Sequence, residues 1–135
     1  MVNFLGMQTM LKLLLVGAGG FLGSVARALL SNFVQQTSAS QFPYGTLAVN
    51  LLGCFVIGLL AQLGEAREIF SAETRAFIFI GILGGFTTFS SFGNETINLL
   101  RSGFPLSACL NILAQLALGL LAVWGGRLLA QQIWG

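Results

Sequence analysis

Hydroxyl, amide and carboxyl groups lie beside a row of phenylalanines in one apolar stretch in the second half of the chain. The phenylalanines recur every third residue and the polar residues follow at three- and four-residue spacings: Phe86, Phe89 and Phe92, then Thr87, Ser91, Asn94 and Glu95. In a helix these spacings place each set on one face. Aromatic rows usually make core or lipid contacts. However, a phenyl ring has a positive edge, so rings around a narrow passage can also stabilise a small anion.

The same stretch contains a glycine pair and a threonine pair, Gly84-Gly85 and Thr87-Thr88. Both pairs weaken a helix, and a break at membrane depth leaves backbone carbonyls that protein or a water-filled cavity must satisfy. Carbonyls freed in this way are common cation ligands. The alternative is a local kink in which the threonine hydroxyls bond to the backbone. We expect residues 84–88 to depart from the helix in the middle of the membrane.

Polar residues also align on one face of two other apolar stretches. In one stretch they are Thr46 and Asn50, and Gly53 and Cys54 continue their face; in the other they are Asn111 and Gln115, followed one turn later by Gly119. A single amide of this kind can simply bond to a neighbouring helix, which is worth about 0.6–2 kcal/mol. Three aligned polar faces, however, favour a shared hydrated path.

Two charged residues accompany these faces. Glu95 is the one acid within an apolar stretch, and an ionisable group inside a membrane is by default a functional hypothesis. It is also close to the end of its stretch and could lie among the headgroups. Arg27 could either extend to the interface or attract anions towards the mouth of a path.

These residues must be positioned by four apolar segments: residues 11–33, 44–64, 76–100 and 104–126. A helix needs about 20 residues to cross the ~30 Å hydrocarbon core, so each segment is long enough. Gly19 and Gly23, like Gly81 and Gly85, are four residues apart and allow helices to approach closely. The expected fold is an all-α membrane protein with four transmembrane helices in a single channel domain, residues 1–135.

Composition excludes several other classes of protein. The chain is 56% hydrophobic and 7% charged, whereas soluble domains average about 25% charged residues, so lipid is the natural solvent for its surface. There is no histidine, and the remaining acids gather in one polar connection at Glu65, Glu68 and Glu73, so we do not expect an enzyme. A net charge of +2 without a basic run does not suggest nucleic-acid binding. Cys54 and Cys109 are isolated within apolar runs, and we expect no disulfide.

Assembly and orientation follow from the same pattern. Four thin helices cannot enclose a pore and also bury their own polar faces, so a dimer or a larger assembly is expected. With four spans, Lys12, Arg67, Arg75 and Arg127 lie on one side, and Arg27 and Arg101 on the other. Charge alone favours one orientation with the four-cation side in the cytoplasm, although such a small bias permits insertion both ways.

The chain resembles the small dimeric fluoride channels of the Fluc (CrcB) family through all four spans in order. The matching motifs are GGFLGSVAR at 19–27, GTLAVNLLG at 45–53 and GGFTTFSSF at 84–92. The third motif is long and specific, because it follows the family signature almost residue for residue.

The resemblance implies an antiparallel, dual-topology homodimer in the inner (plasma) membrane. Its two pores would let cytoplasmic fluoride leave the cell passively. A structural sodium ion at the dimer interface would be held by the backbone carbonyls of Gly84 and Thr87 from both subunits. Asn50 would donate hydrogen bonds to fluoride. The other pathway residues implied are Phe89 and Phe92 as pore walls, Thr88 as a further donor, Ser90, Ser91 and Glu95 as a hydroxyl and acid track, and Arg27 in the vestibule.

One departure from the family and two alternative functions remain. Asn111 and Gln115 stand where family members often carry tyrosine and then serine; as amides they keep the lining polar. A four-helix, dual-topology exporter of cationic drugs would have a similar size, but it needs an acid in its first span, and residues 11–33 contain none. A structural subunit of a larger membrane complex would predict no transport by the purified protein.

Overall fold

The computed structural model describes residues 2–134, with side chains from residue 6 onward, and this part of the chain is helical apart from short connections. In chain order the elements are α1 (Val2–Thr37), α2 (Tyr44–Arg67), α3 (Ala72–Arg75), η1 (Ala76–Leu83), α4 (Gly84–Phe86), α5 (Phe89–Arg101), α6 (Pro105–Leu113), η2 (Ala114–Leu118) and α7 (Gly119–Trp134). The two η elements are π-helical turns that continue the helices beside them. Residues 2–134 contain no strand, so the predicted all-α class is confirmed.

Four helical stretches are long and apolar enough to cross a membrane, as the sequence predicts. They are Gly6–Thr37, Tyr44–Arg67, Ala72–Arg101 and Pro105–Trp134. The shortest has 24 residues and is about 36 Å long, which exceeds the ~30 Å hydrocarbon core. Most ends extend beyond the predicted segments, because helical hydrogen bonding continues through the polar residues that flank each apolar run.

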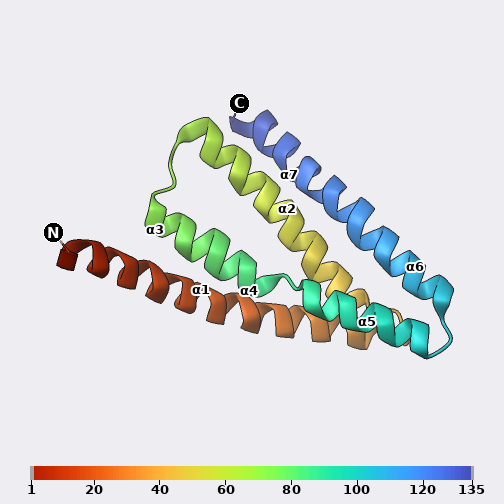
Figure 1. Cartoon of the computed structure of the whole chain (residues 1–135). Coiled ribbons are helices and arrows are strands. Elements are labelled where there is room, and N and C mark those ends of the chain that lie inside the picture. Colours follow the sequence, from red (N-terminus) through yellow and green to blue (C-terminus); the bar gives the residue numbers. More distant parts are fainter. Residues whose placement is uncertain (1, 135) are drawn as a thin grey trace.

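The helices pack as two pairs along the chain (Figure 1). α1 lies beside η1 and α4, and α2 lies beside α7. The pairs are joined where α1 also contacts α2. At that junction the Gln35 amide donates to the carbonyls of Ser40 and Phe42 and accepts from the Gly45 N–H, which fixes the connection between α1 and α2.

Glycines allow the first pair to approach backbone to backbone. A Cβ atom added at Gly19 or Gly23 would overlap a carbonyl of η1, and one added at Gly85 would overlap the carbonyl of Gly20. In lipid such close approach supplies dispersion contacts that replace the hydrophobic drive between helices. The glycines at four-residue spacing therefore form the contact surface between α1 and the third span.

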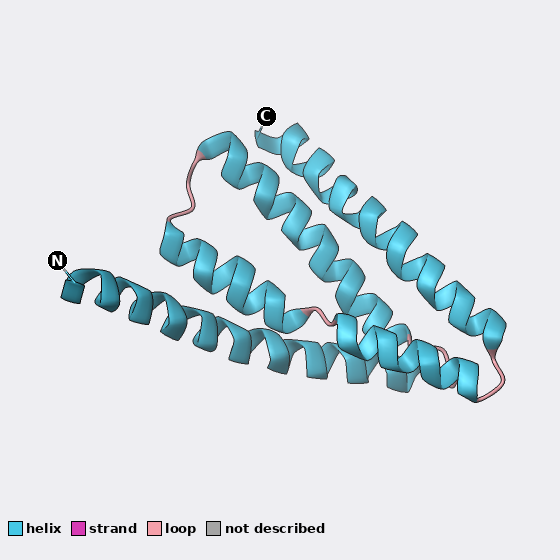
Figure 2. Ribbon diagram, viewed as in Figure 1, coloured by secondary structure: helices cyan, strands magenta, loops and turns pink. Residues whose placement is uncertain are grey.

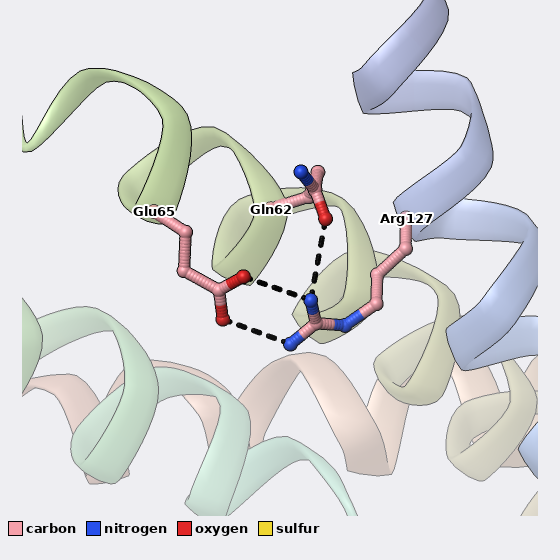
Figure 3. A network of polar contacts seen from close by, with 3 residues as sticks. All are labelled: Gln62, Glu65 and Arg127. Carbon is pink, nitrogen blue, oxygen red and sulfur yellow. Dashed lines mark hydrogen bonds and ion pairs between the residues drawn. The ribbon is translucent and has the colours of Figure 1, made fainter. Parts of the chain in front are cut away.

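The second pair is fastened at the end that holds the α2–α3 connection. Arg127 of α7 donates two hydrogen bonds to the Glu65 carboxylate of α2, at 2.9 and 3.0 Å, and one to Gln62 Oε1 at 3.2 Å (Figure 3). Both charged side chains are exposed, so solvent screens this pair and it adds little to stability. Within the same pair of helices, Gly58 of α2 and Gly126 of α7 have no side chains, so the two backbones come into contact there.

Two extended residues separate α4 from α5 within the third span. Thr87 (φ −89°, ψ 158°) and Thr88 (φ −151°, ψ 111°) form the short loop between the two helices in Figure 2. The segment is shorter than the predicted residues 84–88, since Gly84–Phe86 is helical. Thr88 leaves the helix because its N–H donates to Asn50 Oδ1 at 2.8 Å, whereas a continuous helix would direct it to the Gly84 carbonyl.

Candidate functional site

A cavity of about 370 Å³ lies against the extended segment, between α2, η1, α5 and η2. It receives two of the predicted side chains from α5 and one each from α2 and η2. Together with the extended segment, the predicted residues that line it are Asn50, Gly84, Thr87, Thr88, Phe89, Phe92 and Gln115. The remaining lining is apolar apart from Cys54, and no lysine, arginine or carboxylate contributes to it.

Asn50 connects three elements at this cavity. Its Oδ1 accepts the Thr88 N–H at 2.8 Å, and its Nδ2 donates to the Thr88 carbonyl at 3.1 Å. The same Nδ2 donates to Gln115 Oε1 on η2, also at 3.1 Å. Asn50 therefore replaces the helical hydrogen bond that the Thr88 N–H gives up, and it ties the fourth span to the extended segment.

The Thr88 hydroxyl caps the N-terminus of α5. It accepts the Ser91 N–H at 3.2 Å, which is the side-chain cap expected of a threonine before a helix. It also lies 3.0 Å from Ser91 Oγ and 3.3 Å from Ser90 Oγ. The three hydroxyls predicted for the pathway thus form one cluster at the N-terminus of α5, the end at which a helix dipole favours negative charge.

The two phenylalanines at the cavity differ in exposure. Their ring centroids are 5.4 Å apart and the rings are inclined by 61°, an edge-to-face arrangement. Phe92 is 9% exposed, whereas Phe89 is 80% exposed. Phe92 is therefore fixed within the subunit, and Phe89 projects from it.

Glu95 lies one turn beyond this cluster and borders a second cavity of about 230 Å³. Its Oε1 accepts a 2.7 Å hydrogen bond from the Thr46 hydroxyl of α2, and its Oε2 is buried without a hydrogen-bond partner among the described side chains. Gln41, Asn98 and Ser102 complete the polar lining. The structure therefore places Glu95 at a separate polar cavity.

Asn111 is brought to neither cavity. It is fully buried, and its Nδ2 donates to Thr96 Oγ1 at 2.9 Å, while that hydroxyl donates to the Phe92 carbonyl at 2.7 Å. The chain of bonds ties α6 to the residue that carries a cavity phenylalanine. Sequence reasoning did not select Thr96, although its position four residues after Phe92 is the spacing of a hydroxyl that bonds back to a helix carbonyl.

Arg27 of α1 approaches one of the two carbonyls predicted for a cation, that of Thr87. Arg27 Nη1 is 3.5 Å from the Thr87 carbonyl oxygen, which is long for a hydrogen bond. The described residues contain no group of three or more histidine, cysteine or acidic side chains that could hold a metal ion.

Fold and site together define a multi-pass membrane protein with a largely apolar, phenylalanine-lined cavity that holds a few amide and hydroxyl groups at an interrupted third span. The family model described as "CrcB-like protein, Camphor Resistance (CrcB)" matches residues 14–127. The chain belongs to this family, as its three motifs predict.

Curated relatives cover almost the whole chain. A protein of Geobacter sulfurreducens is 44% identical over 124 residues, which are 92% of this chain and 100% of that protein. A Parabacteroides distasonis protein is 45% identical over 92% of this chain and 96% of its own length. A Shewanella baltica protein is 48% identical over 86% of this chain and 93% of its own length. Each is named "Fluoride-specific ion channel FluC", which does not favour the drug-exporter alternative.

Proposed function

We propose that this chain forms a fluoride-selective channel through which cytoplasmic fluoride leaves the cell passively. The observation that carries the proposal is the cavity at the extended segment, which joins the amides of Asn50 and Gln115 to two phenylalanine rings without any charged side chain. The relatives named as fluoride-specific channels support the same ion.

Fluoride suits this chemistry because it is small and strongly hydrated. A pore must replace its water with N–H and O–H donors and with positive ring edges. Neutral donors bind the ion weakly enough for it to leave again, which conduction requires. A larger, less strongly hydrated anion such as chloride gains less from a narrow site of this kind, so selectivity follows from narrowness and donors together.

The proposed assembly is an antiparallel, dual-topology homodimer with two pores. One subunit supplies only part of a pore wall, and Phe89 extends from it with 80% of its surface exposed. A second copy would cover this ring and close the cavity. In the inner (plasma) membrane, the weak cation bias permits both orientations of the chain.

A structural sodium ion at the dimer interface is part of the same proposal. Sodium is bound by oxygen ligands, and unwound backbone carbonyls supply them in other membrane proteins. The fit rests on two observations: the Thr88 N–H is directed to Asn50 and away from the Gly84 carbonyl, and the Arg27 contact with the Thr87 carbonyl is long. Gly84 and Thr87 of both subunits would hold the ion, and it would coordinate carbonyls that hydrocarbon cannot solvate.

Fluoride efflux from liposomes tests the function. The purified protein should release fluoride from vesicles loaded with potassium fluoride when valinomycin balances charge, and it should release chloride far more slowly. Equal rates for the two anions, or efflux no faster than from protein-free vesicles, would reject the channel. Proton-driven uptake of a cationic dye would support the exporter in its place.

A further inference from the structure

Gln115 and Asn50 hold unequal shares of the hydrogen bonds at the cavity, and we infer that Gln115 supplies the amide N–H that binds the anion. Asn50 then acts as a positioning residue that aims Gln115. This inference rests on the proposed fluoride channel and names the group that contacts the ion within it.

The Asn50 amide has no hydrogen left to donate. An asparagine side chain carries two N–H donors, and both are engaged, one by the Thr88 carbonyl and one by Gln115 Oε1. Its oxygen accepts the Thr88 N–H. Donation to an anion would break one of these bonds and release either the extended segment or Gln115.

The orientation of the Gln115 amide follows from a backbone group. The Thr88 N–H can only donate, so the atom of Asn50 that faces it must be oxygen, and the other atom must be nitrogen. That nitrogen faces Gln115 at 3.1 Å, so the nearer atom of Gln115 must be Oε1 and the remaining atom Nε2. Amide orientations are otherwise open to exchange of N and O, but here one backbone donor fixes both.

The Gln115 nitrogen is the donor left over. Nε2 is buried and has no hydrogen-bond partner among the described side chains, although Gln115 lines the same cavity as Phe89 and Phe92. An unsatisfied buried donor is costly and calls for a missing partner. Since Oε1 is already bonded, polarisation along the amide chain strengthens the remaining N–H groups as donors.

A bridging water is the competing explanation. Asn111 Oδ1, one turn earlier on the same helix, is also buried without a partner among the described side chains, and a water could donate to it while accepting from Gln115. Such a water predicts that both amides stabilise the fold and that neither affects fluoride binding. An anion at Gln115 predicts that substitution of Gln115 weakens fluoride binding and that substitution of Asn111 does not, because the oxygen Oδ1 of Asn111 would repel the anion.

The test begins with two substitutions at Gln115. Gln115→Glu keeps the oxygen that accepts from Asn50 and replaces the Nε2 donor, and Gln115→Met removes the donor without adding charge. Gln131→Glu and Gln131→Met are matched controls on the same span, at an exposed position outside both cavities. Loss of one hydrogen bond to a charged partner should lower fluoride efflux from liposomes about ten- to a hundred-fold in the Gln115 variants. The Gln131 variants should match the parent.

A binding measurement covers any variant that inserts poorly. Fluoride added to the purified parent protein should raise its thermal unfolding temperature, and Gln115→Met should lose this rise even if its baseline is unchanged. Asn111→Leu should keep the rise. A fluoride-dependent rise that persists in Gln115→Met would overturn the inference in favour of the water.

The role of Asn50 is separated by a double substitution. Asn50→Asp keeps the oxygen that accepts from Thr88 but draws Nε2 of Gln115 towards its new carboxylate, so efflux should fall. Asn50→Asp with Gln115→Met should fall no further than the lower single variant, because both changes remove one donor. If the fold-losses of efflux in the two single variants multiply in the double variant, Asn50 donates to the anion independently of Gln115, and the positioning role is rejected. If the parent protein itself conducts no fluoride, the proposed function fails and this inference with it; if the parent conducts and Gln115→Met conducts equally, only the inference fails.

Discussion

Asn50 is the residue on which the extended segment depends most directly. Its side chain bonds to both backbone groups of Thr88. The Thr88 carbonyl keeps its place at the start of α5, but Asn50→Ala would leave the part-buried Thr88 N–H unpaired. This unpaired N–H costs about 1–3 kcal/mol, less where water can enter the cavity. We expect Asn50→Ala to abolish or strongly reduce fluoride efflux while still yielding a folded dimer of lowered thermal stability. Full efflux at parental stability would remove Asn50 from the pathway.

Phe89 differs from Asn50, because we expect its substitution to lower fluoride efflux without lowering the stability of the subunit. Because its ring is 80% exposed in the subunit, Phe89→Ile removes few contacts within the fold. The substitution keeps an apolar side chain and removes the ring edge. Fluoride efflux should therefore fall strongly, while the unfolding temperature of the subunit changes little. Parental efflux from a folded Phe89→Ile protein would exclude the ring as a pore wall.

At the scale of the helices, the four spans could be predicted from the sequence because length and apolar composition alone determine them. The extent of the extended segment could not. Gly84-Gly85 suggested unwinding, yet Gly85 is needed for close contact with Gly20, and the helix persists to Phe86. The decisive hydrogen bond comes from Asn50, thirty-eight residues away along the chain, and spacing within the third span carries no trace of it.

For the candidate site, the sequence predicted the helix face on which each residue lies but not the neighbour that covers that face. The polar and aromatic faces predicted from the sequence include Asn50, Phe89, Phe92 and Gln115, and all four residues line one cavity. Asn111 has the same helical phase as Gln115, but it bonds to Thr96 and is sealed within the subunit. Phase determines which face a residue occupies, whereas the neighbour that covers that face depends on tertiary packing.

The contact between α1 and the third span gives a prediction for these helices. A side chain at position 85 would meet the backbone of Gly20, which cannot move aside as a flexible side chain could. Gly85→Leu should separate α1 from α4 and cost about 1–3 kcal/mol or more. We expect poor yield and a lowered unfolding temperature, measured on the purified protein in detergent. Gly93→Leu is the control, because a Cβ at Gly93 meets nothing within 4 Å.

For the whole molecule, dual topology predicts that one position is reached from both sides of the membrane. Ser38 lies in the connection between α1 and α2. A cysteine introduced there, in a background lacking Cys54 and Cys109, should be labelled by an impermeant reagent both in intact cells and in inverted vesicles. The parent without cysteines measures background labelling. Reaction from one side alone, with complete protection from the other, would leave a single orientation and reject the antiparallel dimer.

The last prediction joins assembly to the cation at the extended segment. Gly84 is exposed, and a Cβ there would come no nearer than 3.8 Å to any other group of the subunit, so the fold itself accommodates a side chain. If two subunits approach at Gly84 and share a sodium ion, Gly84→Leu should yield folded monomers, seen by size-exclusion chromatography with a parental helical content. This outcome differs from that of Gly85→Leu, which should damage the subunit itself.

Replacing sodium by a large organic cation should weaken the parental dimer in the same measurement, since unpaired carbonyls in hydrocarbon cost several kcal/mol. Thr87→Val keeps the backbone carbonyl and loses only the hydroxyl that bonds to Leu83, so it should retain partial sodium dependence. A Gly84→Leu protein that remains dimeric, or a parental dimer indifferent to sodium, would separate assembly from the cation and contradict the proposed interface.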